Sequence, residues 1–555
     1  MIQSCTLSSL LRFSVYTVLL AIGLSACGGA HQQVDLIVHN AKVYTVDSSF
    51  AVVEAFAVKD GQFVAVGSSQ EILSAYQAAN TIDAQGQPVY PGFFDAHCHF
   101  YGYGMALQEA NLVGIASYEA MLDTLKAFAA AHPEQPWLLG RGWDQNNWLD
   151  KEFPTKDALD TLFPNKPVYL VRVDGHAALV NQKALDLAGI TASTRIDGGA
   201  ILLKNGQPTG VLIDNAFKQV GALVPAPDEA IVRRALQQAE QNCFAVGLTT
   251  LSDAGLDYRT IDLIDQMQQK GVLQIRVYAM LSASRGNLSR YLDKGIYSTE
   301  RLNVRSFKIY ADGALGSRGA CLLAPYRDKP DEMGFLLASP AQLDSLVGLI
   351  GSKGFQVNTH CIGDSANRLL LDIYGKYLQE QNDRRWRIEH AQVLDPNDFV
   401  KFAKYSVIPS VQPTHCTSDM YWAEERLGKD RIPYAYAYHT LLQQNGMVAL
   451  GSDFPVEDIS PLYGFHAAVV RQDAKGFPQG GFQKQEALSR EDALRGMTIW
   501  AAHANFEEKI KGSIEAGKYA DFVILAKDLM NAPETELRNI PIQATFVAGK
   551  EVYRR

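Results

Sequence analysis

The chain has 555 residues and a formal net charge of -9, with 47% hydrophobic and 20% charged residues. This length exceeds one simple domain, and the composition is that of a globular protein with a sizeable core. The negative balance and the absence of a basic cluster argue against a nucleic acid partner. The seven cysteines lack paired spacing, so neither a disulfide framework nor a zinc ribbon is expected.

The N-terminus has the pattern of a bacterial secretion signal. Residues 10–24 are apolar apart from Arg12, and Leu24-Ser25-Ala26-Cys27 follows, which resembles a lipobox. The apolar run is shorter than the ~20 residues that span a bilayer. We therefore expect residues 1–27 to be a lipoprotein signal peptide with the lipid anchor on Cys27. Gly28 after the cysteine implies, by the same resemblance, the outer membrane of the cell envelope, facing the periplasm.

Short alternating segments at both ends of the chain predict one discontinuous β domain. Residues 34–38, 41–45 and 55–67 alternate as strands do, and residues 521–525 and 542–553 repeat the pattern near the C-terminus. Residues 34–90 and 505–555 are therefore expected to form a small β-sandwich.

The middle of the chain predicts an α/β fold, a (β/α)8 TIM barrel over residues 91–504. Strand-like segments alternate with helical runs, and eight strands are expected at residues 93–99, 247–251, 273–278, 306–310, 356–359, 387–389, 406–411 and 447–451. Residues 101–225 are too long for one βα connection. They predict an inserted subdomain over the barrel mouth, which also contains a strand at residues 167–172.

Titratable side chains stand in or directly after several of these strands. His97 and His99 project to the same face, because residues two apart in a strand do so. The others are Lys308, His360, His390 and Asp453. Since barrel chemistry lies at the C-terminal strand ends, all six are expected to converge.

Each of these residues also has a plainer interpretation. Lys308 is compatible with a snorkelling side chain, His360 and His390 with hydrogen-bonded core histidines, and Asp453 with a helix cap. Together, however, four histidines, a lysine and an aspartate form a ligand set for zinc or a similar ion.

The ordered set His97-x-His99, Lys308, His360, His390, Asp453 resembles the amidohydrolase superfamily. The similarity is closest to the branch that contains N-substituted formamide deformylase, and it runs from about residue 34 to the C-terminus. Supporting stretches are Gly140-Arg141-Gly142-Trp143-Asp144, Asp174-Gly175-His176, residues 308–318, 410–415, 451–456 and 517–521.

The resemblance implies one or two divalent ions, with Zn2+ the expected metal. It implies that His97 and His99 bind one ion, and that His360 and His390 bind the second. Lys308, as N6-carboxylysine, would bridge them. Asp453 would be a ligand and the general base for a metal-activated water, then the acid toward the leaving nitrogen.

Four further residues beside these motifs are expected to bind substrate: Trp143, His176, Arg318 and His415. For His176 a structural hydrogen bond is the alternative. Arg318 is suited to a carboxylate or carbonyl oxygen, or to an ion pair with an acid.

The expected activity is metal-dependent hydrolysis of a non-peptide C–N bond in an amide or formamide. An esterase, lactonase or acylamino-acid hydrolase on the same centre is the alternative. A non-catalytic solute-binding lipoprotein is a third reading, but it needs neither Asp453 nor Lys308. The expected partners are a small-molecule substrate, the membrane through the lipid anchor, and a second copy of the chain in a homodimer.

Overall fold

The structure is a computed structural model that describes residues 31–555. The predicted lipobox with Cys27 lies outside the described residues. Within residues 31–555, no helix has both the length and the apolar composition that crossing a bilayer requires.

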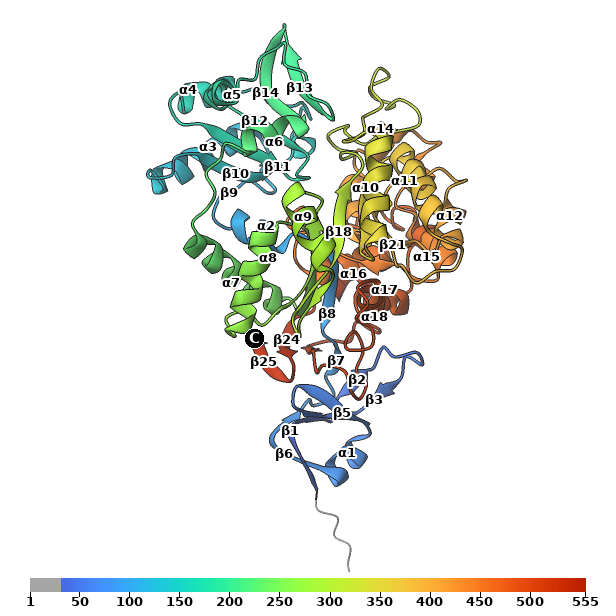
Figure 1. Ribbon diagram of the computed structural model, residues 1–555. Helices are drawn as coiled ribbons and strands as arrows, with labels where there is room; N and C mark the ends of the chain where they lie inside the picture. Colours follow the sequence, from blue (N-terminus) through green and yellow to red (C-terminus); the bar gives the residue numbers. More distant parts are fainter. Residues whose placement is uncertain (1–30) are drawn as a thin grey trace, which may run out of the picture.

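The centre of the molecule is a barrel of eight parallel strands, as the sequence predicts (Figure 1). In hydrogen-bonded order they are β8 (Phe93–Cys98), β15 (Leu248–Leu256), β16 (Arg276–Ser282), β18 (Leu302–Tyr310), β19 (Gln356–Cys361), β20 (Arg387–His390), β21 (Ile408–Val411) and β22 (Ala449–Leu450). Helices cover the outside, among them α7 (Glu229–Ala245), α8 (Tyr258–Gln269), α9 (Arg285–Lys294), α10 (Pro340–Ser352), α11 (Asp364–Tyr377), α12 (Phe399–Lys404) and α15 (Tyr438–Asn445).

Helix α8 illustrates how local sequence forms this outer layer. The Asp257 side chain accepts a hydrogen bond from the N–H of Arg259 and caps the helix. Ile261, Ile264 and Met267, three residues apart, are buried against the barrel. Each buried side chain of this size contributes about 1.5–3 kcal/mol, so packing holds the helix in place.

Hydrogen bonds to the Asp95 carboxylate and between backbone groups close the barrel between β22 and β8. The described chain has no regular strand ladder there. Asp95 Oδ2 accepts a hydrogen bond from Ser452 Oγ at 2.6 Å, and Asp453 N donates to His97 O at 2.7 Å. A Cβ atom on Gly451 would lie 2.5 Å from His97 N, so this approach requires glycine. Asp95 therefore fastens the seam.

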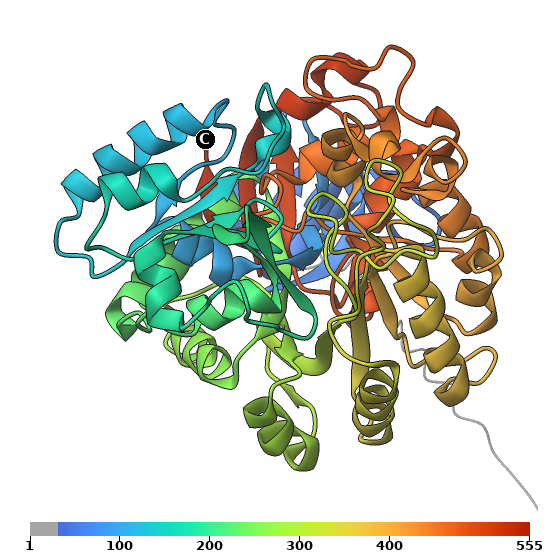
Figure 2. The same ribbon diagram turned by 90° about the horizontal axis from the view of Figure 1, so that it is seen from above.

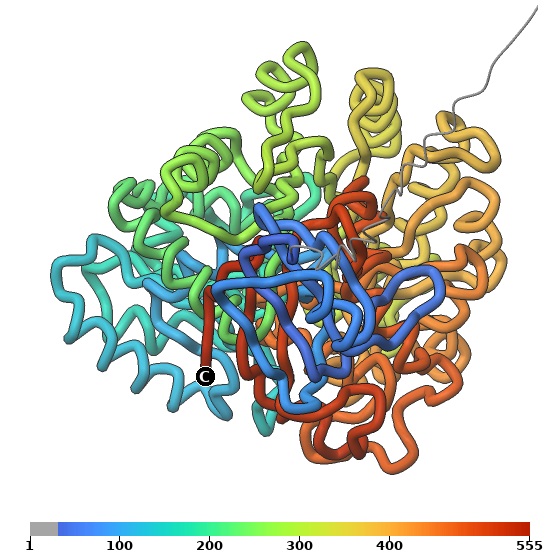
Figure 3. Tube along the Cα trace, turned by 90° about the horizontal axis from the view of Figure 1, so that it is seen from below, coloured from blue at the N-terminus to red at the C-terminus, as the bar shows by residue number. Residues whose placement is uncertain are grey.

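Two packed sheets form a β-sandwich from both ends of the chain (Figure 3). One sheet has the order β5 (Gln62–Gly67), β4 (Ala55–Lys59), β1 (Gln32–His39), β6 (Tyr76–Asp83). The other has the order β25 (Lys550–Arg554), β24 (Ile542–Val547), β23 (Phe522–Leu525), β7 (Pro88–Pro91), β2 (Lys42–Tyr44), β3 (Val52–Val53). The rings of Phe522 and Phe546 stack 4.3 Å apart in the shared core.

A third sheet, built from the segment between β8 and α7, lies at the opposite end of the barrel from the sandwich (Figures 1 and 2). Its order is β13 (Gly199–Lys204), β14 (Gln207–Asp214), β12 (Ala177–Val180), β11 (Val168–Arg172), β10 (Leu138–Trp143), β9 (Ala110–Asn111). Helices α3 (Tyr118–Ala131), α4 (Asp157–Leu162), α5 (Gln182–Ala188) and α6 (Asn215–Gly221) accompany it. We call residues 110–221 the insertion.

Candidate metal centre

A cavity of about 540 Å³ opens where the insertion meets the C-terminal ends of the barrel strands. The barrel lines it with His99, Lys308, His360, His390, His415 and Asp453. The insertion lines it with Arg141, Asp144, Arg172, Asp174 and His176. The residues that the sequence places at strand ends therefore do lie together.

Two imidazoles on β8 and just after it are held in one tautomer. His97 Nδ1 lies 2.5 Å from Glu389 Oε2, and His99 Nδ1 lies 3.0 Å from Ala254 O. Both partners are acceptors, so each Nδ1 carries the proton and each Nε2 keeps its lone pair. This arrangement leaves on Nε2 of both rings a lone pair that can bind a metal.

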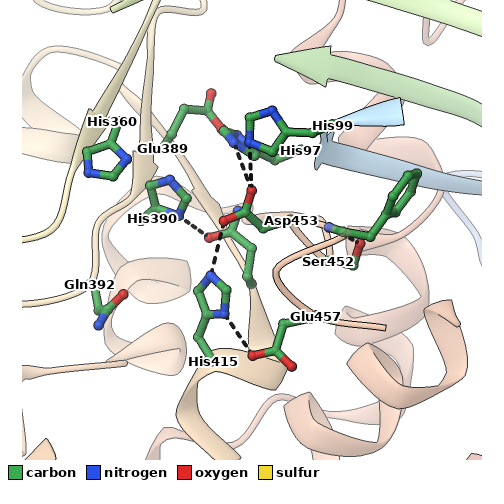
Figure 4. A network of polar contacts seen from close by, with 12 residues as sticks. His97, His99, His360, Glu389, His390, Gln392, His415, Ser452, Asp453 and Glu457 are labelled. Atoms are coloured by element: carbon green, nitrogen blue, oxygen red, sulfur yellow. Dashed lines mark hydrogen bonds and ion pairs between the residues drawn. The ribbon is translucent and has the colours of Figure 1, made fainter. Parts of the chain in front are cut away.

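His390, at the end of β20, is oriented in the same way. Its Nδ1 donates to Gln412 Oε1 at 2.7 Å, so its Nε2 also keeps a lone pair. The ring centroids of His97 and His390 are 4.9 Å apart. The imidazoles of His97, His99 and His390 thus present Nε2 to a common region (Figure 4).

The Asp453 carboxylate lies among these rings (Figure 4). Its Oδ1 is 3.1 Å from His99 Nε2 and 3.6 Å from His97 Nε2, and it is buried without a hydrogen-bond donor. Lone pairs that face a carboxylate oxygen repel it unless a proton or a metal ion lies between them. The donor set therefore fits a divalent ion.

Two overlapping sets of three donors share Asp453. One is His97, His99 and Asp453, and the other is His390, His415 and Asp453. His415 Nε2 lies 3.4 Å from Asp453 Oδ2, and its Nδ1 lies 3.1 Å from Glu457 Oε1. His415, expected from the sequence to contact substrate, is thus also placed to bind a metal.

Burial sets the protonation states that metal ligands need. Burial and the Lys308 charge lower the pKa of His97 to about 4, and burial lowers the pKa of His390 well below its usual value. For Asp453, burial raises the pKa, but the contacts with His415 and His99 and the charges of the neighbouring histidines together outweigh burial and hold the pKa well below the usual range. At neutral pH, His97 and His390 are thus neutral and Asp453 is ionised. Burial lowers the pKa of His415, but its contacts with Asp453 and Glu457 outweigh burial and raise the pKa to about 10, so His415 must lose a proton before it can bind a metal.

The backbone at two of these donors is left-handed. His390 has φ of 74° and Asp453 has φ of 64°, a region that costs other residues than glycine about 1–3 kcal/mol. His390 ends β20 and Asp453 lies three residues after the end of β22, and the surrounding barrel holds both. Such backbone is concentrated at functional sites.

A buried arginine and glutamate support His97 from behind. Arg387 Nη2 donates to Glu389 Oε2 at 2.9 Å and to Ala96 O at 2.6 Å. Burial raises the pKa of Glu389, but Arg387 and His97 lower it below its usual range. Glu389 is therefore an anion that fixes the His97 ring. We assigned it no role from sequence, although Arg387-Ile388-Glu389 alternates in a buried strand and so points both charges inward.

Lys308 lies beside His97 in the interior of the barrel. Its side chain is 1% exposed, and Nζ is 3.1 Å from His97 Nε2. Burial lowers the pKa of Lys308 to about 8, although Glu389 and Asp453 act in the opposite direction. Lys308 is therefore neutral in a larger fraction of molecules near neutral pH than an exposed lysine is.

His360 and His176 form a second pair of rings on the far side of His390. The His360 ring centroid is 4.6 Å from that of His390 and 4.9 Å from that of His176. His360 Nε2 lies 3.5 Å from Gly313 O, and His360 belongs to neither donor set, so its role as a ligand stays a prediction. His176 lines the cavity and is also hydrogen bonded, with Nδ1 2.7 Å from Asp214 Oδ1.

Two predicted substrate contacts lie elsewhere. Trp143 is fully buried in the core of the insertion, where Nε1 donates to Leu170 O at 2.8 Å. Arg318 forms an ion pair with Asp328 at 2.7 Å. Neither residue lines the cavity, so substrate contact by Trp143 is corrected to a packing role. For Arg318, the ion pair is the alternative that the structure shows.

The fold and the donor cluster place this protein in the class of metal-dependent hydrolases that have a TIM barrel. The Amidohydrolase family matches residues 80–553, and the chain belongs to this family.

Relatives of known sequence and structure extend over nearly the whole chain. Protein LONG AFTER FAR-RED 3 of Arabidopsis thaliana is 32% identical, covering 94% of this chain and 91% of that protein. N-substituted formamide deformylase of Arthrobacter pascens is 26% identical, covering 94% and 99%. The crystal structure of an uncharacterised metal-dependent hydrolase of Pyrococcus horikoshii superposes with a TM-score of 0.73 at 26% identity, covering 90% and 99%.

Proposed function

We propose that this hydrolase cleaves a C–N bond in a small amide or formamide, with Asp453 as general base. The observation that carries the proposal is the Asp453 Oδ1 atom, buried without a donor and facing the Nε2 atoms of His97 and His99. The similarity to a formamide deformylase over nearly the whole chain supports the choice of bond.

The residues have distinct tasks in this reaction. Asp453 accepts a proton from the attacking water and returns it to the leaving nitrogen. Glu389 and Gln412 hold His97 and His390 with Nε2 toward the centre. One or two divalent ions bound there, with zinc as the proposed metal, would polarise the substrate carbonyl and make a water more acidic.

Carboxylation of Lys308 is part of this proposal. A neutral amine adds to CO2 to form a carbamate and release one proton, and burial favours the neutral amine. The anionic carbamate would remove the repulsion between an ammonium and a cation beside His97. Intact mass spectrometry under native conditions would detect the added carboxyl group, which acid should release.

The test is metal analysis of the purified protein together with assays on matched amides, formamides, esters and lactones. We expect stoichiometric divalent metal, loss of rate with a chelator, and recovery on adding Zn2+. Hydrolysis of esters or lactones without amides would favour the alternative activity. Metal-replete protein that hydrolyses none of these compounds would contradict catalysis of this kind.

A further inference from the structure

Strand β10 carries a bulge where it reaches the cavity. In its pairing with β11, Arg141 is opposite Val171 and Trp143 is opposite Arg172, so Gly142 is the extra residue. Gly142 has φ of 107°, and a Cβ atom there would lie 2.4 Å from Val113 Cγ2. The bulge lets Trp143 join the insertion core while Arg141, two residues earlier, faces the cavity.

Arg141 has few partners for its guanidinium group. Nη2 donates to Val173 O at a long 3.4 Å, and Nε is buried without a hydrogen-bond partner. Glu109 and Asp453 are near enough for their charges to act on it, but no described carboxylate forms an ion pair with it. Burial raises the pKa of Glu109 to about 7, so Glu109 is only partly ionised at neutral pH.

The other arginine of the cavity has a polar partner on each of its three side-chain nitrogens. Arg172 pairs with Asp144, donates from Nη1 to Asp174 Oδ2 at 2.6 Å, and donates from Nε to Gln145 Oε1 at 2.9 Å. Of the two arginines that line the cavity, Arg141 is therefore the one whose charge has no carboxylate partner. The lining also includes Leu315, Ile362, Trp422 and Val456, which suits an apolar group in the same molecule.

We propose that Arg141 binds a carboxylate on the substrate, which makes it a specificity-determining residue supplied by the insertion. This rests on the proposed function and narrows it to amides or formamides that carry a negative charge and an apolar group. A guanidinium presents parallel N–H donors that match the two oxygens of a carboxylate. An unpaired guanidinium in a partly desolvated site gains most from such a partner.

The test compares racemic N-formylphenylalanine with racemic N-formylphenylalaninamide, which differ only in carboxylate against carboxamide. Metal-loaded wild type, Arg141→Met, Arg141→Lys and the control Arg195→Met are assayed for kcat/KM. Dissociation constants are measured in the same four forms carrying Asp453→Asn. Arg195 is an exposed insertion residue that donates only to backbone carbonyls.

We expect wild type to prefer the carboxylate by about 10- to 100-fold, the range of a charged hydrogen bond. Arg141→Met should remove the preference by weakening only the carboxylate probe, Arg141→Lys should keep part of it, and Arg195→Met should match wild type. Equal losses on both probes, or no preference in wild type, would overturn the assignment.

The experiment tests formamide cleavage and carboxylate binding by Arg141 independently. If wild type hydrolyses neither probe, formamide cleavage is contradicted for these compounds, but the dissociation constants still decide the role of Arg141. A carboxylate preference in binding that disappears in Arg141→Met supports the site. Equal binding of both probes, or binding of neither, overturns it. Circular dichroism confirms that the variants are folded.

Discussion

At the scale of single residues, the centre depends on which imidazole nitrogen carries the proton. Glu389, Ala254 O and Gln412 each accept from an Nδ1 atom, and this leaves three Nε2 atoms for a metal. The ligands themselves are visible in the sequence as histidines at strand ends. The acceptors that orient them are as necessary, because a ring in the other tautomer has no lone pair on Nε2.

Glu389→Gln tests this orientation directly. The amide keeps the shape but removes the charge that faces His97 and Arg387, so we expect metal affinity to fall about 10- to 100-fold. The measurement is competition with a chromophoric chelator. Glu119→Gln, on an exposed surface of the insertion, is the control. Unchanged affinity in Glu389→Gln would mean that His97 needs no anionic support.

His97→Ala and Asp453→Asn should differ in whether they lose metal as well as activity. Loss of the His97 ligand should lower metal content and rate together. Asp453→Asn keeps one oxygen but loses the proton acceptor, so it should retain much of the metal while kcat falls about 10²- to 10⁴-fold. Metal analysis and steady-state kinetics on the same preparations separate the two. Near wild-type turnover in metal-replete Asp453→Asn would exclude the general base role.

At the scale of elements, periodicity predicts the eight barrel strands and the residues that end them, because strand alternation and strand–helix succession are local properties. Contacts across the barrel join residues that are far apart in the sequence, so periodicity does not predict them. Asp95 lies two residues before His97 in the sequence, yet it fastens β8 to the segment after β22. Trp143 lies beside a cavity residue, but the bulge at Gly142 turns it into the core.

One acidic residue after β23 fastens the sheet that the two chain ends share. Asp528 Oδ2 accepts from Lys42 Nζ at 2.7 Å and Tyr44 OH at 2.8 Å, and Oδ1 accepts from Tyr90 OH at 2.8 Å. Burial raises its pKa, but the hydrogen bond from Lys42 and the others outweigh it and lower the pKa to about 2.

Asp528→Asn should therefore destabilise the protein by about 1.5–3 kcal/mol at pH 7. Because the folded pKa is depressed, the carboxylate stabilises the fold above its unfolded pKa of about 3.9, and this contribution is lost as pH falls toward 2. The difference in the free energy of unfolding between wild type and Asp528→Asn, measured by chemical denaturation, should become smaller from pH 7 to pH 3. Asp293→Asn, which removes an exposed ion pair with Lys353, should change stability little. A difference in the free energy of unfolding that does not depend on pH would contradict this role of the ionised Asp528 carboxylate.

At the scale of the whole molecule, the sandwich and the insertion lie at opposite ends of the barrel (Figure 1). A buried ion pair joins the barrel to the sandwich. Arg276 at the start of β16 pairs with Asp521 beside β23, with Nε 2.6 Å from Oδ2. The cavity opens at the insertion end. An attachment through the chain before β1 would therefore leave the cavity mouth facing away from the attachment point.

The last prediction is that Cys27 carries such an attachment, a lipid, in a bacterial cell envelope. The full-length protein should sediment with membranes and dissolve in detergent, and Cys27→Ser should move it to the soluble fraction without the mass of the acyl chains. Cys5→Ser, which changes a cysteine outside the lipobox, should behave as wild type. Because the residues of the metal centre all lie within residues 31–555, we expect the metal content and kcat/KM of released Cys27→Ser protein to equal those of wild type. Cys27→Ser protein that stays with the membrane would show that another contact holds it there.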